Sequence, residues 1–300
     1  MGAEEFTRTD LACEWGKGIE MDGTRSATGR WLHGQWETLR ICTPEAAARM
    51  GRAQGEYVTV SGEAIWRLEK RAQRALEELI ARVLVRLLEG ALGHEVDRST
   101  SVLVVGLGNR DITADALGPM AVNELLVTRH LRRQEPAIFE KMDCCSVAAL
   151  APGVLGQTGM EATEVIAGAV RRCGAQAVVA IDALAARSCD RLAATVQLSN
   201  TGISPGAGIG NDRASLSLST LGVPVIAVGI PTVVDSSTLV YDALRRAGID
   251  QIDERLRQIL ENGRRFYVSP KEADQITART ASLLARAINR ALIGVADLHG

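Results

Sequence analysis

The chain has 300 residues, which is long enough to form a buried core. Its composition, 46% hydrophobic and 23% charged, is that of a folded and not a disordered chain. Its formal net charge of −2 excludes binding of nucleic acid through a broad basic field. The apolar stretches are too short or too interrupted to span a bilayer, and the first ten residues, MGAEEFTRTD, contain no secretory signal. We therefore expect a globular protein of the cytoplasm, without a membrane or direct nucleic-acid partner.

The first 60 residues are expected to form an accessory region packed on the core. About 40 polar, glycine-rich and irregular residues come first, and residues 38–42 and 56–61 have the β-branched content of short strands. A long amphipathic helix follows, because apolar residues recur at intervals of three and four between Ile65 and Leu88.

From residue 101 the pattern alternates between strands and helices. Three continuous apolar runs are typical of strands buried on both faces: 101–108, 175–182 and 223–230. Helices are predicted over residues 115–130 and at the C-terminal end, where Ser269 is a candidate N-cap. The alternation predicts an α/β fold of three layers, with a mostly parallel sheet sandwiched between helices.

The cysteines and histidines do not form a recognisable cluster. No CxxC pair occurs, and the four histidines are scattered. We therefore expect no metal and no cofactor. We interpret the six cysteines as buried free thiols in a reducing compartment: Cys13, Cys42, Cys144, Cys145, Cys173 and Cys189.

Two acidic residues lie where ligands collect in open α/β sheets, at the carboxyl ends of strands. Asp182 ends the run at 175–182, and Asp115 lies a few residues beyond the run at 101–108. If the two strands are neighbours, both carboxylates face one crevice, where one can activate water while the other stays protonated. Aspartates at such places are also typical caps and loop anchors, so the pattern alone leaves both interpretations open.

Gly106 and Gly108 follow a strand and precede a helix, as in dinucleotide-binding turns. The third glycine of that motif would fall at Asp111, and a carboxylate there repels a pyrophosphate. A nucleotide-dependent enzyme is therefore a weak alternative. The sequence contains no GxSxG, HExxH or P-loop motif.

Several long motifs of the sequence match one known family. The stretch GLGNRDITADALGPMAVNELLVTRHL resembles the GLGN…TPDALGP…VTRH signature of the germination protease family. Further similar blocks follow in family order: ALAPGVLGQTGMEATEVI (149–166), IDALAARS (181–188), NTGISPGAGIGNDR (200–213), GIPTVVDSSTL (229–239) and YVSPKEADQI (267–276).

The resemblance implies an endopeptidase made as an inactive zymogen in the developing spore. After self-cleavage, such an enzyme degrades the small acid-soluble proteins that coat spore DNA. The resemblance also implies that Asp115 and Asp182 are catalytic, that the chain is a homotetramer in the spore core, and that its fold is similar to that of hydrogenase maturation proteases. Those relatives recognise nickel, so a metal-recognising or inactive relative is the alternative.

Two positions depart from the family pattern. Ala114 stands where the family has a proline, which we expect to loosen the turn that presents Asp115. Asp143 adds a third acid shortly before the APGV block, and the sequence leaves its orientation open.

The segment Thr9-Asp10-Leu11-Ala12 resembles the acid–apolar–alanine site that these proteases cleave. Because termini are easily threaded into a protease, we expect cleavage between Asp10 and Leu11. Residues 1–10 are then a propeptide and residues 11–300 a single peptidase domain, with 11–60 as its accessory β-containing region. Mild acid is expected to trigger cleavage by weakening contacts that hold the segment away and by singly protonating the aspartate pair.

The loop at 200–213 is too long to be a simple connector. Its glycines would let main-chain N–H groups approach a peptide closely. We therefore expect Gly206, Gly208 and Asn211 to bind substrate beside the crevice, with a flexible surface loop as the alternative.

Overall fold

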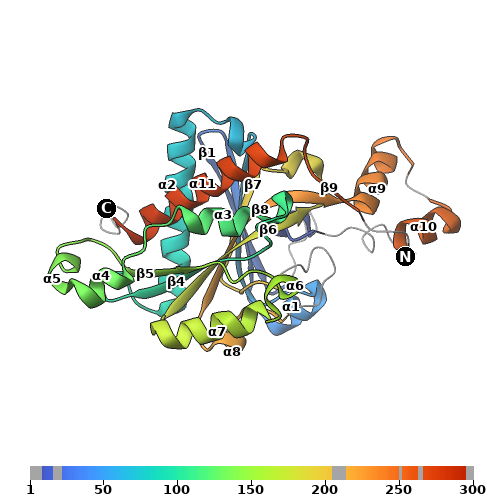
Figure 1. The fold of residues 1–300 in the computed structure, drawn as a ribbon. Helices are drawn as coiled ribbons and strands as arrows, with labels where there is room; N and C mark the ends of the chain where they lie inside the picture. The colour runs from blue at the N-terminus through green and yellow to red at the C-terminus, as the bar shows by residue number, and fades with distance from the viewer. Residues whose placement is uncertain (1–8, 16–21, 205–213, 250–251, 263–265, 295–300) are drawn as a thin grey trace.

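The computed structural model describes residues 9–15, 22–204, 214–249, 252–262 and 266–294. Within these residues, one sheet has the strand order β1-β2-β3-β7-β8-β6-β4-β5, and β9 pairs with β8 (Figure 1). Its strands are β1 (Thr24–Trp31), β2 (Gly34–Ile41), β3 (Gly55–Gly62), β4 (Ser101–Gly106), β5 (Ser146–Leu150), β6 (Ala177–Ala186), β7 (Thr195–Ser199), β8 (Val225–Asp235) and β9 (Tyr267–Val268).

The sheet has a parallel half and an antiparallel half. Strands β5, β4, β6 and β8 pair in parallel, and three of them contain the apolar runs expected from the sequence. Strands β1, β2, β3 and β7 pair antiparallel, and β7 joins the two halves by pairing antiparallel with β8. The α/β class is confirmed. The sheet is mixed, and residues 24–62 extend it instead of packing against it.

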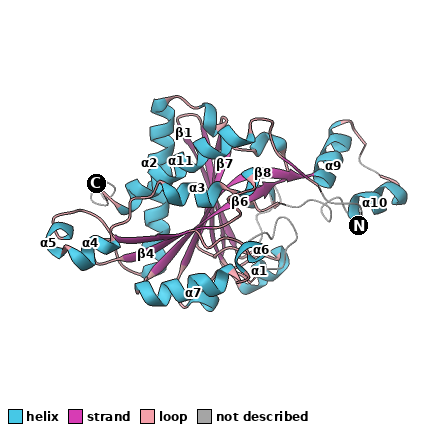
Figure 2. Ribbon diagram, viewed as in Figure 1, coloured by secondary structure: helices cyan, strands magenta, loops and turns pink. Residues whose placement is uncertain are grey.

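Helices cover both faces of the sheet (Figure 2). One face is covered by α2 (Lys70–Leu92), α3 (Leu117–Asn123) and α11 (Ala273–Leu292), and the other by α7 (Ala162–Cys173) and α8 (Leu218–Leu221). The remaining helices lie around these layers: α1 (Pro44–Met50), α4 (Arg129–Gln134), α5 (Pro136–Phe139), α6 (Leu155–Thr158), α9 (Ser236–Arg246) and α10 (Glu254–Asn262).

The alternation of side chains along β4 explains why both faces need cover. Val102 and Val104 pack into the core beneath α2 and α11, whereas Leu103 and Val105 pack into a second core beneath α7. Successive strand residues point to opposite faces of the sheet, so a strand that is apolar at every position must be covered on both faces. Each such side chain contributes about 1.5–3 kcal/mol to folding when fully buried.

The helix expected over residues 115–130 is wrong as a single element, because α3 ends at Asn123 and α4 begins at Arg129. Between them, Thr128 pairs with the region that begins β5. Its N–H donates to the Val147 carbonyl at 3.0 Å, and its hydroxyl donates to the Cys145 carbonyl at 2.6 Å. A residue whose backbone donates to a strand is not available to continue a helix.

The long helix α2 begins at Lys70, five residues later than Ile65, and the last helix begins at Ala273. Glu272 occupies the N-cap position there, so the cap expected at Ser269 is wrong. The physical reason is that β9 pairs with β8 up to Val268, and a turn must follow before a helix can start.

Candidate active site

Asp182 lies inside β6, so the expectation that it ends the strand is wrong. Strand β4 ends at Gly106, which pairs with Ile181, whereas β6 continues to Ala186 along β8. Asp182 therefore lies where its parallel neighbour stops and leaves the sheet edge open. Asp182 is 5% exposed, and its Oδ1 accepts the N–H of Ala183 at 2.9 Å.

Asp115 lies on a short 3₁₀ helix, η4 (Thr113–Asp115), which follows β4. Its Oδ2 accepts the N–H of Asn109 at 2.7 Å. Gly108 makes this approach possible, because its φ is +109° and a Cβ there would lie 2.0 Å from the Asp115 carbonyl oxygen. Only glycine combines this backbone conformation with such close contact.

Neighbouring elements fix the η4 turn. Thr232 of β8 donates its hydroxyl to the Ala114 carbonyl at 2.6 Å, and Thr277 of α11 donates to the Thr113 carbonyl at 3.2 Å. The Thr113 hydroxyl donates to Asp274 Oδ1 at 2.6 Å. Two elements thus hold the turn through hydrogen bonds, and the looser turn expected from alanine at position 114 stays a prediction.

One cavity of about 700 Å³ is lined by both aspartates, Asp115 and Asp182. Asp10 and Gln197 line it as well. Both acids thus line one crevice, and their role as a catalytic pair stays a prediction. Asp143 is not among the lining residues. It lies near the C-terminal end of α11 in space, where its main-chain carbonyl accepts the N–H of Gly294 at 2.8 Å.

Residues Thr9–Trp15, which we call the N-terminal segment, lie along this cavity. The Asp10 N–H donates to the Ala185 carbonyl at 2.9 Å, and the Ala185 N–H donates to Asp10 Oδ2 at 2.8 Å. Leu11 is fully buried among apolar side chains of β6 and β8: Leu184, Ala186 and Val234. The expected processing site is thus docked at the end of β6, and not held away from the cavity.

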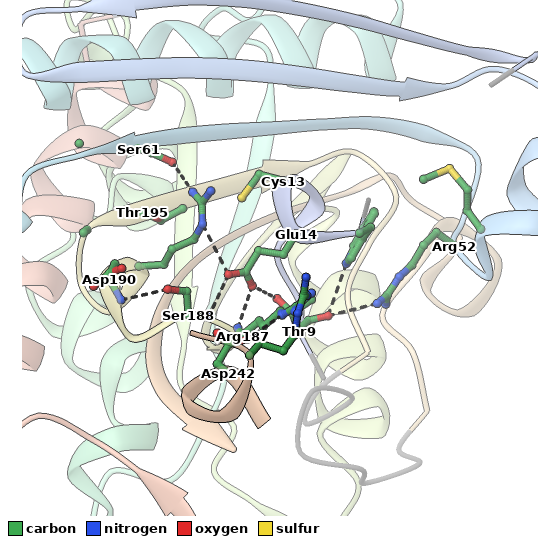
Figure 3. A pocket seen from close by; sticks show the side chains of 16 residues that line it. Thr9, Cys13, Glu14, Arg52, Ser61, Arg187, Ser188, Asp190, Thr195 and Asp242 are labelled. Carbon is green, nitrogen blue, oxygen red and sulfur yellow. Dashed lines mark hydrogen bonds and ion pairs between the residues drawn. The ribbon is translucent and has the colours of Figure 1, made fainter. Parts of the chain in front are cut away.

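Glu14 anchors the other end of the N-terminal segment (Figure 3). One oxygen of its carboxylate accepts the N–H of Arg187 at 2.8 Å and also the Thr9 hydroxyl. The other oxygen accepts the N–H of Ser188 at 3.1 Å and lies 3.5 Å from the Arg191 guanidinium. The Glu14 side chain is 6% exposed, so these charge-assisted contacts replace its lost hydration.

A second cavity, of about 790 Å³, lies beside Glu14 and is rich in arginine (Figure 3). At its edge Arg52 donates to the Thr9 carbonyl at 3.1 Å and stacks over the Trp15 ring at 4.2 Å. Burial lowers the pKa of Arg52, and the charge of Asp10 acts in the opposite direction. Trp15 and Arg52 line both cavities, so the N-terminal segment borders each of them.

The two glycines that suggested a nucleotide site contact the protein's own backbone. A Cβ at Gly106 would lie 2.2 Å from the Gly118 carbonyl oxygen of α3, and Gly108 approaches Asp115 as described above. These close contacts account for both glycines without a bound pyrophosphate.

Gly206, Gly208 and Asn211 lie outside the described residues, so their role in binding substrate stays a prediction. The two ends of their loop are described. Ile203 and Leu216 exchange backbone hydrogen bonds at 2.9 and 2.7 Å, and Ser204 and Ser215 line the cavity of the two aspartates.

Within the part of the chain that the structure describes, no group of three or more His, Cys, Asp or Glu residues is placed to hold a metal ion. None of the described helices is both long and apolar enough for a membrane span. Cys144 and Cys145 are buried, but Cys189 is exposed and Cys13, Cys42 and Cys173 are partly exposed. The expectation that all six thiols are buried is therefore wrong.

Gln197, Glu14 and Arg191 were not expected at these cavities from the sequence. A signal for Gln197 was present, because TVQLS alternates polar and apolar residues as a strand with one polar face does. No local pattern marks Glu14 or Arg191, since their contact joins residues far apart in the chain.

Replacing Gly108 by alanine is expected to displace Asp115 and to destabilise the fold by about 1–3 kcal/mol, because the new Cβ meets backbone at a strained φ. Thermal unfolding measures the loss of stability, and peptidase activity measures the displacement. Gly93→Ala is the matched control, since Gly93 also has positive φ but a Cβ there would meet no atom within 4 Å. Equal losses in both variants would show that only backbone strain matters.

The α/β fold with two acids in one cavity defines a candidate hydrolytic enzyme. A family model described as germination protease matches residues 34–252. The chain is 37% identical to the germination protease of Caldanaerobacter subterraneus subsp. tengcongensis, over 95% of this chain and 94% of that protein. It is 36% identical to that of Clostridium acetobutylicum, with the same coverage, and 42% identical to that of Bacillus subtilis, over 71% of this chain and 58% of the relative.

This chain belongs to the germination protease family, and its class is that of a peptidase. Among solved structures it is similar to the [NiFe] hydrogenase maturation protease HycI from Thermococcus kodakarensis KOD1, with a TM-score of 0.36 and 15% identity. That match covers 69% of this chain and 99% of the other, and at this level it supports no conclusion about activity or fold.

Proposed function

We propose that this chain is an aspartic-type endopeptidase, made as a zymogen, that cleaves itself between Asp10 and Leu11 and then degrades small acid-soluble spore proteins. Membership of the germination protease family supports the peptidase class and the connection with germination. The single observation that carries the proposal further is that Asp10, Asp115 and Asp182 line one cavity.

Two carboxyl groups in one cavity can divide the roles that peptide hydrolysis requires. The ionised group removes a proton from water, whose oxygen attacks the Asp10 carbonyl carbon, and the protonated group supplies a proton to the leaving Leu11 nitrogen. The Leu11 N–H donates to the Thr9 hydroxyl at 3.1 Å, which orients the bond to be cleaved. Like charges at close range favour a singly protonated pair, so mild acid is expected to promote the reaction.

Loss of residues 1–10 would also open the cavity to substrate proteins after the enzyme has cleaved its own chain. Asp10 forms part of the cavity lining, so its departure clears the position for the acidic residue that precedes the scissile bond of a substrate. Two further parts of the proposal come from the family resemblance, namely a homotetramer and a location in the spore core.

Incubation of the full chain at mildly acidic pH tests this function. We expect mass spectrometry to show the loss of ten residues and a new N-terminus at Leu11, because the pair then reaches its singly protonated form. A purified small acid-soluble spore protein, added afterwards, is expected to be cut after an acidic residue. A different new terminus, or an intact chain together with an intact substrate, would contradict the proposal.

A further inference from the structure

The side chain of Gln197 contacts the N-terminal segment on both sides of Leu11. Its Nε2 donates to the Asp10 carbonyl oxygen at 2.7 Å, and its Oε1 accepts the N–H of Ala12 at 2.5 Å. The assignment of the amide atoms is fixed by these partners, because a carbonyl only accepts and a backbone N–H only donates. Gln197 is 9% exposed; its bond to Ala12 is buried, and its bond to Asp10 is partly buried at the cavity.

The strand that carries Gln197 explains why a side chain makes these contacts. The backbone of β7 pairs with β3 on one side and with β8 on the other, so it has no free edge on which another extended segment could pair. Val196 and Leu198 point into the core beneath α2, which directs Gln197 to the opposite face. Its amide group therefore does for Leu11 what a neighbouring strand's peptide unit does in a sheet.

The acceptor in this pair is the reacting group of the proposed cleavage. The Asp10 carbonyl belongs to the Asp10–Leu11 peptide bond, and both Asp10 and Gln197 line the cavity of the two aspartates. Leu11 has an extended backbone, with φ −82° and ψ 123°, which is how proteases commonly bind the chain that they cut.

We propose that Gln197 is a catalytic residue that holds the scissile peptide unit and stabilises the charge formed on its carbonyl oxygen. The inference rests on the proposed self-cleavage. When the water oxygen bonds to the Asp10 carbon, the π electron pair moves onto the carbonyl oxygen, and the Nε2–H group of Gln197 donates to that oxygen. When the intermediate collapses, the C–N bond breaks and the main-chain carbonyl group of Asp10 becomes a new α-carboxyl group. The Leu11 nitrogen gains a proton and becomes the new N-terminus. The same two bonds would hold the corresponding residues of a substrate protein.

Self-processing of three variants of the full chain tests the assignment. Gln197→Leu removes both bonds, and we expect its rate constant for loss of residues 1–10 to fall about 100-fold. Gln197→Glu keeps the acceptor for Ala12 but loses the donor when ionised. Thr59→Val is the matched control, because Thr59 is directly opposite Gln197 on β3 and its hydroxyl has no partner among the described residues.

The pH profile separates a role in the reaction from a role in docking. A protonated glutamic acid can donate its O–H to the Asp10 carbonyl, so the rate of Gln197→Glu relative to the wild type is expected to rise as pH falls from about 7 to about 5. This comparison uses a variant of the same shape, so it also decides the matter if Gln197→Leu does not fold.

Three results would overturn the inference. If the wild type processes itself and Gln197→Leu does so at the same rate, Gln197 is not involved, and the proposed function stands. If Gln197→Glu is slower by a constant factor at every pH, the residue only ties the segment in place. If the wild type does not process itself at any pH, both the inference and the proposed function fail.

Discussion

Asp182→Asn and Asp115→Asn are each expected to abolish the loss of residues 1–10 while the protein still folds. Asparagine has the shape of aspartate but can neither accept a proton from water nor supply one, so we expect the rate constant to fall by about 10²- to 10⁴-fold. Asp182 is 5% exposed inside β6, and Asp115 is held by the Asn109 N–H, so both side chains have fixed positions in the cavity. Intact mass measured over time gives the rate.

Asp143→Asn is the matched control for these variants, because Asp143 is not among the residues that line the cavity. Thermal unfolding of all three variants separates loss of chemistry from loss of structure. Self-processing at the wild-type rate in Asp115→Asn or Asp182→Asn would remove that aspartate from the mechanism.

Glu14→Ala is expected to release the N-terminal segment and to make Cys13 reactive. Burial raises the pKa of the Cys13 thiol to about 12, although the charge of Arg191 acts to lower it. At a pH of about 8 almost no thiolate is present on a group with so high a pKa, whereas an exposed thiol has a pKa of about 8.5 and reacts readily. We expect iodoacetamide to modify Cys13 at least about tenfold faster in the variant than in the wild type.

The same variant is expected to process itself more slowly, because Asp10 is no longer held in the cavity. Cys189 is exposed and serves as the reference thiol within each chain. Glu95→Ala, which removes an exposed carboxylate, is the control variant. If Cys13 of the wild type reacts as fast as Cys189, the segment is not docked in solution, and the contacts of Glu14 do not anchor it.

The apolar runs of the sequence determined the inner strands of the fold. The runs at 101–108, 175–182 and 223–230 correspond to β4, β6 and β8, because a strand that is buried on both faces has no polar position to interrupt it. Asp115 and Asp182 lie near the ends of two of these runs, and both line one cavity.

The boundaries of the helices and strands, and the partners of each strand, could not be predicted from the sequence pattern. Asp182 lies within β6 because β8 continues to pair with that strand after β4 has ended, and no local pattern records the length of a neighbour. Thr128 interrupts the expected helix because its N–H donates to Val147 of β5 and its hydroxyl donates to Cys145 just before β5. Strands β1, β5 and β7 were not predicted, since β1 is mostly polar and β5 and β7 are only five residues long.

By itself, the sequence therefore determined the α/β class, three of the parallel strands, the candidate positions Asp115 and Asp182, and the family. These properties rest on local composition and on long motifs, which a chain displays without folding. Only the tertiary structure decided that the antiparallel strands extend the same sheet, that Asp10 enters the cavity of the two aspartates, and that Gln197 and Glu14 hold the segment there. The physical reason is that the contacts of Gln197 with Asp10 and of Glu14 with Ser188 join residues more than 150 positions apart, and hydrogen bonds between such distant residues leave no periodicity in the sequence.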